Sequence, residues 1–216
     1  MPHVELSADR LSALAKIDLR GSQLTRLPEA LAHCHAALVH LDIGNNPIHS
    51  LEGLHPKLLK LRVLFATNCR LGPTLPPGGP LTTLLGLYML SIKENGLEEL
   101  DGDALPSTLG WLIATQNRIA NVRNADRLSN VRKLMLSHNH LGAAQLQALA
   151  QSIPRLEMLR VACNRIESLP PAVASHRCLG WLAMGGNAVC AQLLEERLRC
   201  AGAEAVVELA DASAVD

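Results

Sequence analysis

Apolar and polar positions alternate along this chain in a short pattern that returns eight times. Each copy approximates Leu-x-x-Leu-x-Leu-x-x-Asn-x-Leu, and successive copies begin 22 to 26 residues apart. The alternation at the centre of each copy predicts a short strand with one buried and one outward face. The clearest copies occupy residues 38–48, 87–97, 109–119 and 156–166, and looser copies begin at Leu14, Leu61, Val131 and Leu179.

The copy at residues 109–119 illustrates how one unit is expected to fold. Leu109, Leu112 and Ala114 should point inward, whereas Trp111 and Ile113 should point outward. Strands of successive units should then stack in parallel. A single unit cannot bury its own apolar side, so the strands need their neighbours to form a continuous core.

A short polar residue follows each predicted strand at a fixed position, which we call the ladder position. It is Asn in six units and Ser22 or Cys69 in the other two. An Asn amide can satisfy backbone groups left open in the turn, including those of the next repeat. We therefore interpret this column as structural and not catalytic.

This pattern resembles the leucine-rich repeat. The resemblance implies an α/β fold, namely a curved, right-handed solenoid with a parallel sheet on its concave face. Short helices, 3-10 turns and loops are expected on the convex face. We expect residues 1–13 to form an N-terminal cap, residues 14–190 about eight repeats, and residues 191–216 a C-terminal cap helix and tail.

The segments between the strands differ in their predicted structure. Leu-Pro pairs in residues 24–31 and 166–173 predict turns into short helices, and residues 141–153 predict a true α-helix. The two 22-residue intervals allow a tight 3-10 or extended return. Residues 72–80 hold four Pro and three Gly, which predicts a surface loop, either a tolerated insertion or a contact element.

Both ends of the stack are expected to carry caps, because an open solenoid end exposes its core. Ser7 to Leu11 predicts an N-capped helical turn before the first strand. At the other end an amphipathic helix should present Leu193, Leu194 and Leu198 to the last repeat.

The outward strand positions carry the functional prediction, because stacking does not need their side chains. The chain has only four aromatic residues, and three of them fall on these positions. An exposed apolar stripe of this kind is typical of a partner site, although a trailing segment, a neighbouring domain or tight packing can also account for it. The predicted protein-binding residues are Val63, Phe65, Met89, Trp111, Ile113, Met135, Met158, Arg160 and Trp181.

Charged residues replace this stripe in the first two repeats. Lys16, Asp18, Arg20, His40 and Asp42 form a mixed-charge end. Such an end can set the register at an interface rim, or it can be ordinary solvated surface.

Composition narrows the compartment and the class of partner. Twenty basic and twenty acidic residues balance, which disfavours partners held mainly by charge, such as nucleic acid or an anionic membrane. There is no apolar run of membrane-spanning length, no secretory signal pattern and no Asn-x-Ser/Thr sequon. The six cysteines also lack disulfide-cap spacing. We therefore expect a cytoplasmic monomer.

Candidate chemistry is sparse. His138 and His140 flank a ladder Asn and should point to opposite sides, and the run His33-Cys34-His35 lacks the remaining ligands that zinc needs. Cys190 and Cys200 can meet within the C-terminal cap, but a disulfide is not expected inside a cell. Phosphate-binding glycine loops, G-x-S-x-G and convergent acid pairs are all missing. The sequence predicts no metal, no cofactor and no enzyme activity.

Four stretches, LPSTLGWLIATQNRI, VRKLMLSHNHL, LEMLRVACNRIESLP and CLGWLAMGGNAVC, resemble the repeat region of bacterial, plant and algal leucine-rich-repeat protein kinases. No kinase motif follows Cys190, so the resemblance implies a recognition domain without kinase activity. The 22-residue repeats are also similar to those of phosphatase-regulating repeat proteins. We expect a protein-interaction module with a role in signalling. The alternative is a regulatory or targeting subunit of a kinase or phosphatase; a receptor ectodomain is disfavoured by the missing sequons and cysteine caps.

Overall fold

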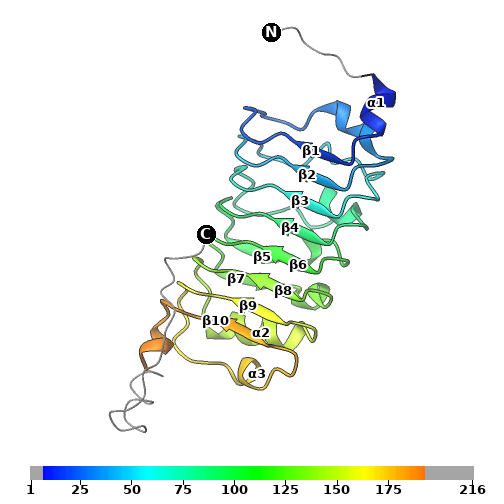
Figure 1. Cartoon of the computed structure of the whole chain (residues 1–216). Helices are drawn as coiled ribbons and strands as arrows, with labels where there is room; N and C mark the ends of the chain where they lie inside the picture. The colour runs from blue at the N-terminus through cyan, green and yellow to red at the C-terminus, as the bar shows by residue number, and fades with distance from the viewer. Residues whose placement is uncertain (1–6, 193–216) are drawn as a thin grey trace, which may run out of the picture.

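The computed structural model describes residues 7–192, which form one stack of parallel strands joined by turns and short helices (Figure 1). Eight strands make one sheet in the order β1-β2-β3-β4-β6-β8-β9-β10. All eight predicted units are therefore confirmed as strands of one sheet. Their bounds are Lys16–Asp18 for β1, His40–Asp42 for β2, Val63–Phe65 for β3, Met89–Ser91 for β4, Trp111–Ile113 for β6, Lys133–Met135 for β8, Met158–Arg160 for β9 and Trp181–Ala183 for β10.

The central residue of each strand builds the core. Leu41, Leu64, Leu90, Leu112 and Leu134 have no exposed surface, because each lies between equivalent residues of its neighbours. The register is in phase throughout, so that residues at one position of the repeat form straight columns across the sheet. The alternation of inward and outward side chains predicted for residues 109–119 is confirmed.

The ladder Asn residues join each repeat to the one before it. Asn117 Oδ1 accepts hydrogen bonds from the backbone N–H groups of Asn95 (2.9 Å) and Leu97 (3.1 Å). Its Nδ2 donates to the carbonyls of Ile92 and Ala114, both at 3.0 Å. The structural role is confirmed, but the predicted direction toward the next repeat is wrong. The side chain leans back because the unpaired groups of the preceding turn face it.

Cys69 takes the place of Asn in this column. Its Sγ donates to the carbonyl of Ile43 at 3.2 Å and to that of Thr67 at 3.5 Å. Burial raises the pKa of the Cys69 thiol, and a hydrogen bond from the Asn46 backbone opposes that shift only in part. A buried thiol held in its protonated form is a poor nucleophile, which fits a structural role.

The residue before each ladder position lies in the left-handed region of the backbone. This column contains Gly21, Asn45, Asn68, Glu94, Gln116, His138, Cys163 and Gly186, each with φ between 52° and 72°. The positive φ turns the chain out of the strand in every repeat. At Gly186 the need for glycine is also steric, because a Cβ would lie 2.8 Å from Cys163 Sγ.

The convex side holds short helices and a second sheet. The 3-10 helices are η1 (Glu29–Cys34), η2 (Pro80–Thr83), η3 (Gly102–Ala104) and η4 (Ala125–Leu128), and the α-helices on this side are α2 (Ala143–Ser152) and α3 (Pro171–Ala174). These positions confirm the true helix predicted in residues 141–153 and the two Leu-Pro turns. In the two short repeats, strands β5 (Glu99–Asp101) and β7 (Asn121–Arg123) pair in parallel. The convex segment of each short repeat is therefore an extended strand followed by a 3-10 helix.

Residues 72–80 form the predicted loop, and hydrogen bonds fasten it to the next repeat. The Pro73 carbonyl accepts from Glu98 N–H at 2.8 Å, and the Gly78 N–H donates to the Asp103 carbonyl at 2.9 Å. Leu75 packs against the core. The surface loop is therefore confirmed and is held against the solenoid, and its role as an insertion or a contact element stays a prediction.

The helix α1 (Ala8–Ser12) begins after Ser7, as predicted, although the Ser7 side chain makes no capping hydrogen bond. Leu193, Leu194, Leu198 and Cys200 lie outside the described residues, as does most of the segment 191–216. The division into caps and solenoid therefore stays a prediction.

We predict that Asn117→Ala lowers the free energy of unfolding by about 2–4 kcal/mol, because it leaves several buried backbone groups without a partner. Urea denaturation measures this loss. Arg118→Ala, one position along and exposed, should change stability by less than about 0.5 kcal/mol. Equal effects of the two substitutions would show that the Asn117 amide does not hold the repeats together.

Candidate partner-binding face

The outward strand residues form two columns across the concave face. The first column holds Lys16, His40, Val63, Met89, Trp111, Lys133, Met158 and Trp181. The second column holds Asp18, Asp42, Phe65, Ser91, Ile113, Met135, Arg160 and Ala183. All nine residues predicted from the sequence lie in these columns, so the fold brings them onto one face.

Most of these side chains are half-buried by their neighbours in the sheet, and the exposure increases at the end of the stack. Trp181 is 54% exposed on the last strand. Tyr88, just before β4, is 46% exposed and lies against Gly110, where an added Cβ would meet its ring. Every aromatic residue of the chain is thus on this face or at its edge.

Trp111 and Lys133 form a contact that the predicted site did not contain. The Lys133 Nζ lies 4.8 Å from the centre of the Trp111 ring, which is cation–π geometry. The Trp111 Nε1 is shielded from solvent and has no hydrogen-bond partner. An unpaired buried donor costs about 1–3 kcal/mol, so a bound acceptor that reaches this group would be favoured. The spacing of 22 residues between the two positions is the sequence signal for this contact.

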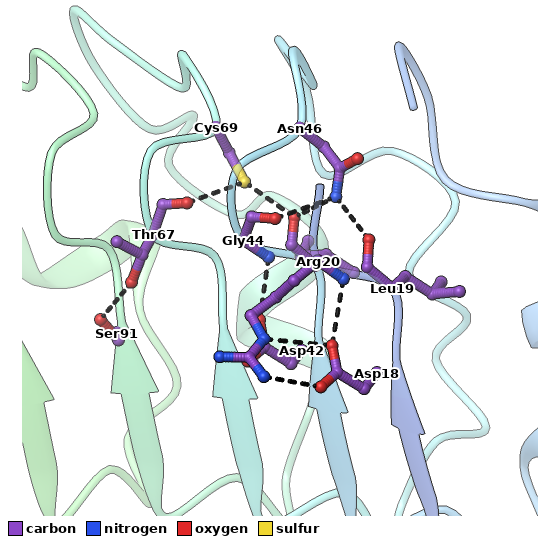
Figure 2. Close-up of polar contacts among 10 residues, drawn as sticks. Asp18, Leu19, Arg20, Asp42, Gly44, Asn46, Thr67, Cys69 and Ser91 are labelled. Atoms are coloured by element: carbon purple, nitrogen blue, oxygen red, sulfur yellow. Dashed lines mark hydrogen bonds and ion pairs between the residues drawn. The ribbon is translucent and has the colours of Figure 1, made fainter. Parts of the chain in front are cut away.

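The mixed-charge end is an ion-pair network (Figure 2). Arg20 donates from Nη2 to Asp18 Oδ2 at 2.9 Å and from Nε to Asp18 Oδ1 at 3.2 Å, and Nε also lies 3.2 Å from Asp42 Oδ2. Asp42 is buried and accepts from Gly44 N–H at 2.9 Å. One guanidinium therefore bridges the carboxylates of two neighbouring strands.

The boundary between this network and the apolar stripe is also ordered. The rings of His40 and Phe65 meet edge to face, with 5.3 Å between their centroids. Thr67, in the turn after β3, and Ser91, at the end of β4, have their hydroxyl oxygens 3.0 Å apart (Figure 2). The polar end thus satisfies its own groups and leaves few of them open to a partner.

A second apolar patch lies where the chain enters the strands, and the sequence prediction missed most of it. Leu59 and Leu85 are 59% and 62% exposed, and Val39 is 40% exposed. Tyr88 borders the same edge. The signal in the sequence is an apolar residue two positions before the buried leucines Leu61 and Leu87. We call Val39, Leu59, Leu85 and Tyr88 the edge patch.

Metal chemistry has no geometric support in the part of the chain that the structure describes. No three His, Cys, Asp or Glu side chains there gather around a possible ion. His138 is exposed at its left-handed position, and His140 is half-buried on the other side of Asn139. Among residues 7–192, no helix is long and apolar enough to cross a membrane.

Known proteins resemble this chain in both sequence and fold. Podocan-like protein 1 of Mus musculus is 33% identical over 176 residues, which are 79% of this chain and 31% of that protein. Lumican of Rattus norvegicus is 26% identical over 163 residues, covering 74% of this chain and 46% of lumican. The chain spans about a third of the podocan-like relative and under half of lumican. No protein-family model matches.

Among solved structures, internalin C2 of Listeria monocytogenes superposes with a TM-score of 0.72 at 21% identity, covering 85% of this chain and 76% of internalin C2. The leucine-rich-repeat domain of APL1 superposes with a TM-score of 0.60, covering 76% of this chain and 41% of that structure. These superpositions establish the fold. This chain has the leucine-rich-repeat solenoid fold. Its relatives in sequence are leucine-rich-repeat proteins of a kind that is typically non-enzymatic.

The prediction of a cytoplasmic protein is wrong, because podocan-like protein 1, podocan, osteomodulin and lumican are secreted proteins of the extracellular matrix. The prediction relied on a missing secretory signal pattern, missing sequons and cysteines without disulfide-cap spacing, and none of these decides the compartment. Cys34 and Cys69 are buried in the core and form no disulfide with another described cysteine. The resemblance to kinase-linked repeats stays a prediction.

We predict that the Asp18 carboxyl group titrates below its ordinary range. The Arg20 side chain, and next its backbone N–H, lower the pKa of Asp18 by hydrogen bonding to the ionised form. The stabilisation from this pair is therefore present above the ordinary pKa and is lost as pH falls through the lowered pKa. Carboxyl-carbon NMR should show the midpoint rising in Arg20→Gln.

Arg118→Gln, an exposed change outside the polar network, should leave the Asp18 midpoint where it is in the wild type. An unchanged midpoint in Arg20→Gln would contradict the proposed cause.

Proposed function

We propose that this protein is a non-catalytic protein-interaction module that binds a protein partner on its concave face. The observation that supports this most directly is the stripe of Trp, Met, Phe and Ile side chains in the two outward columns of strands β3 to β10. An apolar surface of this extent is typical of interaction sites on soluble proteins.

Residue type supports the same proposal. Trp is enriched among residues that dominate binding energies, and Met adapts its shape to irregular partner surfaces. Trp111 and Trp181 lie at two places along the stripe, with Met135 and Met158 on the strands between them. This arrangement offers two rigid anchors with adaptable side chains between them.

Sheet packing alone accounts poorly for these residues. Fully buried leucines such as Leu112 and Leu134 hold the strands together through the core. The large apolar residues of the outward columns, by contrast, keep part of their surface in solvent. Smaller polar side chains at those positions would stack equally well, as Ser91 does on β4. Large apolar residues on the outward side therefore favour a role in binding.

Docking on a protein kinase or phosphatase is a narrower prediction that comes from the sequence resemblance alone. The monomeric state is likewise a prediction. Because the chain spans only part of its relatives, their partners are not assigned to it. The proposal is limited to the face and to the class of molecule that binds there.

We predict that Trp111→Ala combined with Met135→Ala abolishes capture of the partner, because each removes an apolar contact worth about 2 kcal/mol or more at the centre of an interface. Capture is measured by cross-linking mass spectrometry with both intracellular and secreted proteins of the source organism. Circular dichroism and thermal melting should stay close to the wild type, since both side chains point outward.

Leu59→Ala combined with Leu85→Ala is the matched control, because it removes a similar apolar area from the edge patch. This variant should retain capture. If it loses capture while the concave variant retains it, the binding site is the edge patch and the proposal is wrong.

A further inference from the structure

Charged side chains are unevenly distributed along the concave face. In the two outward columns, both carboxylates, Asp18 and Asp42, lie on β1 and β2. From β4 to β10 these columns contain Lys133 and Arg160 and no acidic residue. A chain with a net charge of zero thus has one wholly cationic stretch on its proposed binding face.

The two ends also differ in how their charges are neutralised. At β1 and β2 the Arg20 guanidinium lies within 3.2 Å of both carboxylates. At β8 and β9, by contrast, neither Lys133 nor Arg160 forms an ion pair within residues 7–192. The nearby Glu157 is already bound to Arg132 at 2.7 Å. Lys133 stacks on the Trp111 ring, but both positive charges lack a carboxylate partner within residues 7–192 and can pair with an acidic ligand.

The register places these two cations diagonally on neighbouring strands. Lys133 lies opposite Met158, and Met135 lies opposite Arg160. With strands about 4.8 Å apart and a rise of about 3.3 Å per residue, the two backbone positions are about 8 Å apart. Each cation has a methionine beside it, and the aromatic rings of Trp111 and Trp181 lie on the strands at either side.

We propose, on the basis of the function proposed above, that the occupant of this face is an acidic peptide segment of a protein partner. Its carboxylates bind Lys133 and Arg160, and its aliphatic side chains pack on Trp111, Met135, Met158 and Trp181. The five strands from β4 to β10 span about 19 Å, which matches about six residues of an extended chain.

The mixture of charge and apolar surface selects a peptide over a sulfated polysaccharide. Polyanions are held mainly by many cations, whereas this stretch offers two cations within an apolar stripe. A peptide that alternates carboxylate and aliphatic side chains satisfies both kinds of group. Complementary charge also accelerates association and makes it dependent on salt.

The test is selection of random displayed peptides on the immobilised full chain, followed by affinity measurement on the strongest binder as a synthetic peptide. The selected sequences should combine Asp or Glu with Leu, Ile, Val or Phe. Lys133→Glu with Arg160→Glu should weaken binding by about tenfold or more, as should replacing the peptide's Glu and Asp by Gln and Asn.

Two further variants make the result specific. Arg118→Glu with Arg165→Glu reverses the same charge at exposed turn positions and should keep the affinity within about twofold. Lys133→Gln with Arg160→Gln removes the cations without adding acid, and it should also weaken binding. This variant replaces the Glu variant as the test if circular dichroism shows that the Glu variant does not fold.

The outcomes separate this inference from the function on which it rests. If the selected peptides are neutral or basic but still need Trp111 and Met135, the face binds proteins and the acidic chemistry is wrong. Acidic peptides that are insensitive to both cation variants would also overturn the inference. Binding of heparin through Lys133 and Arg160, without acidic peptides, would assign the cations to a polysaccharide. Peptides insensitive to every concave variant would overturn both proposals.

Discussion

The hydrogen bonds of the ladder Asn side chains are the interaction on which the rest of this structure depends. Each buried amide accepts from the preceding turn and donates back to its carbonyls, as Asn117 does with Asn95 and Ile92. A turn in water would satisfy these groups with solvent, but a stacked turn cannot. The amide therefore fixes the spacing of the repeats, and that spacing keeps the strands in register.

Because the ladder and the buried leucines maintain the stack, the outward columns are free to vary. The concave face shows the consequence. Asp18 and Asp42, bridged by an arginine, lie on β1 and β2, whereas Lys133 and Arg160, which have no acidic partner among the described residues, lie on the structurally equivalent strands β8 and β9. The same backbone thus presents different chemistry at its two ends. In a solenoid, position along the stack specifies where a partner sits.

The strands, their register and the outward columns followed from the sequence because periodicity reports which residues share a face. Other features depend on the path of the chain between strands, which periodicity does not encode. The backward direction of the ladder bonds and the exposure of Leu59 and Leu85 are of this kind. The contact of Lys133 with Trp111 is different, because the 22-residue spacing places the two residues side by side on β6 and β8. The compartment was mispredicted because it is not determined by the chemistry of the fold.

The Trp111 indole N–H has no acceptor, and the Lys133 ammonium stacks on the Trp111 ring without an ion-pair partner among residues 7–192; both lie at the centre of the stripe. A fold selected for stability alone would replace Trp111, because a buried donor without an acceptor costs free energy. Apolar and cationic groups that stay unsatisfied in the free protein are groups that a ligand can satisfy. The part of this face that contributes least to folding is therefore the part with most to gain from binding.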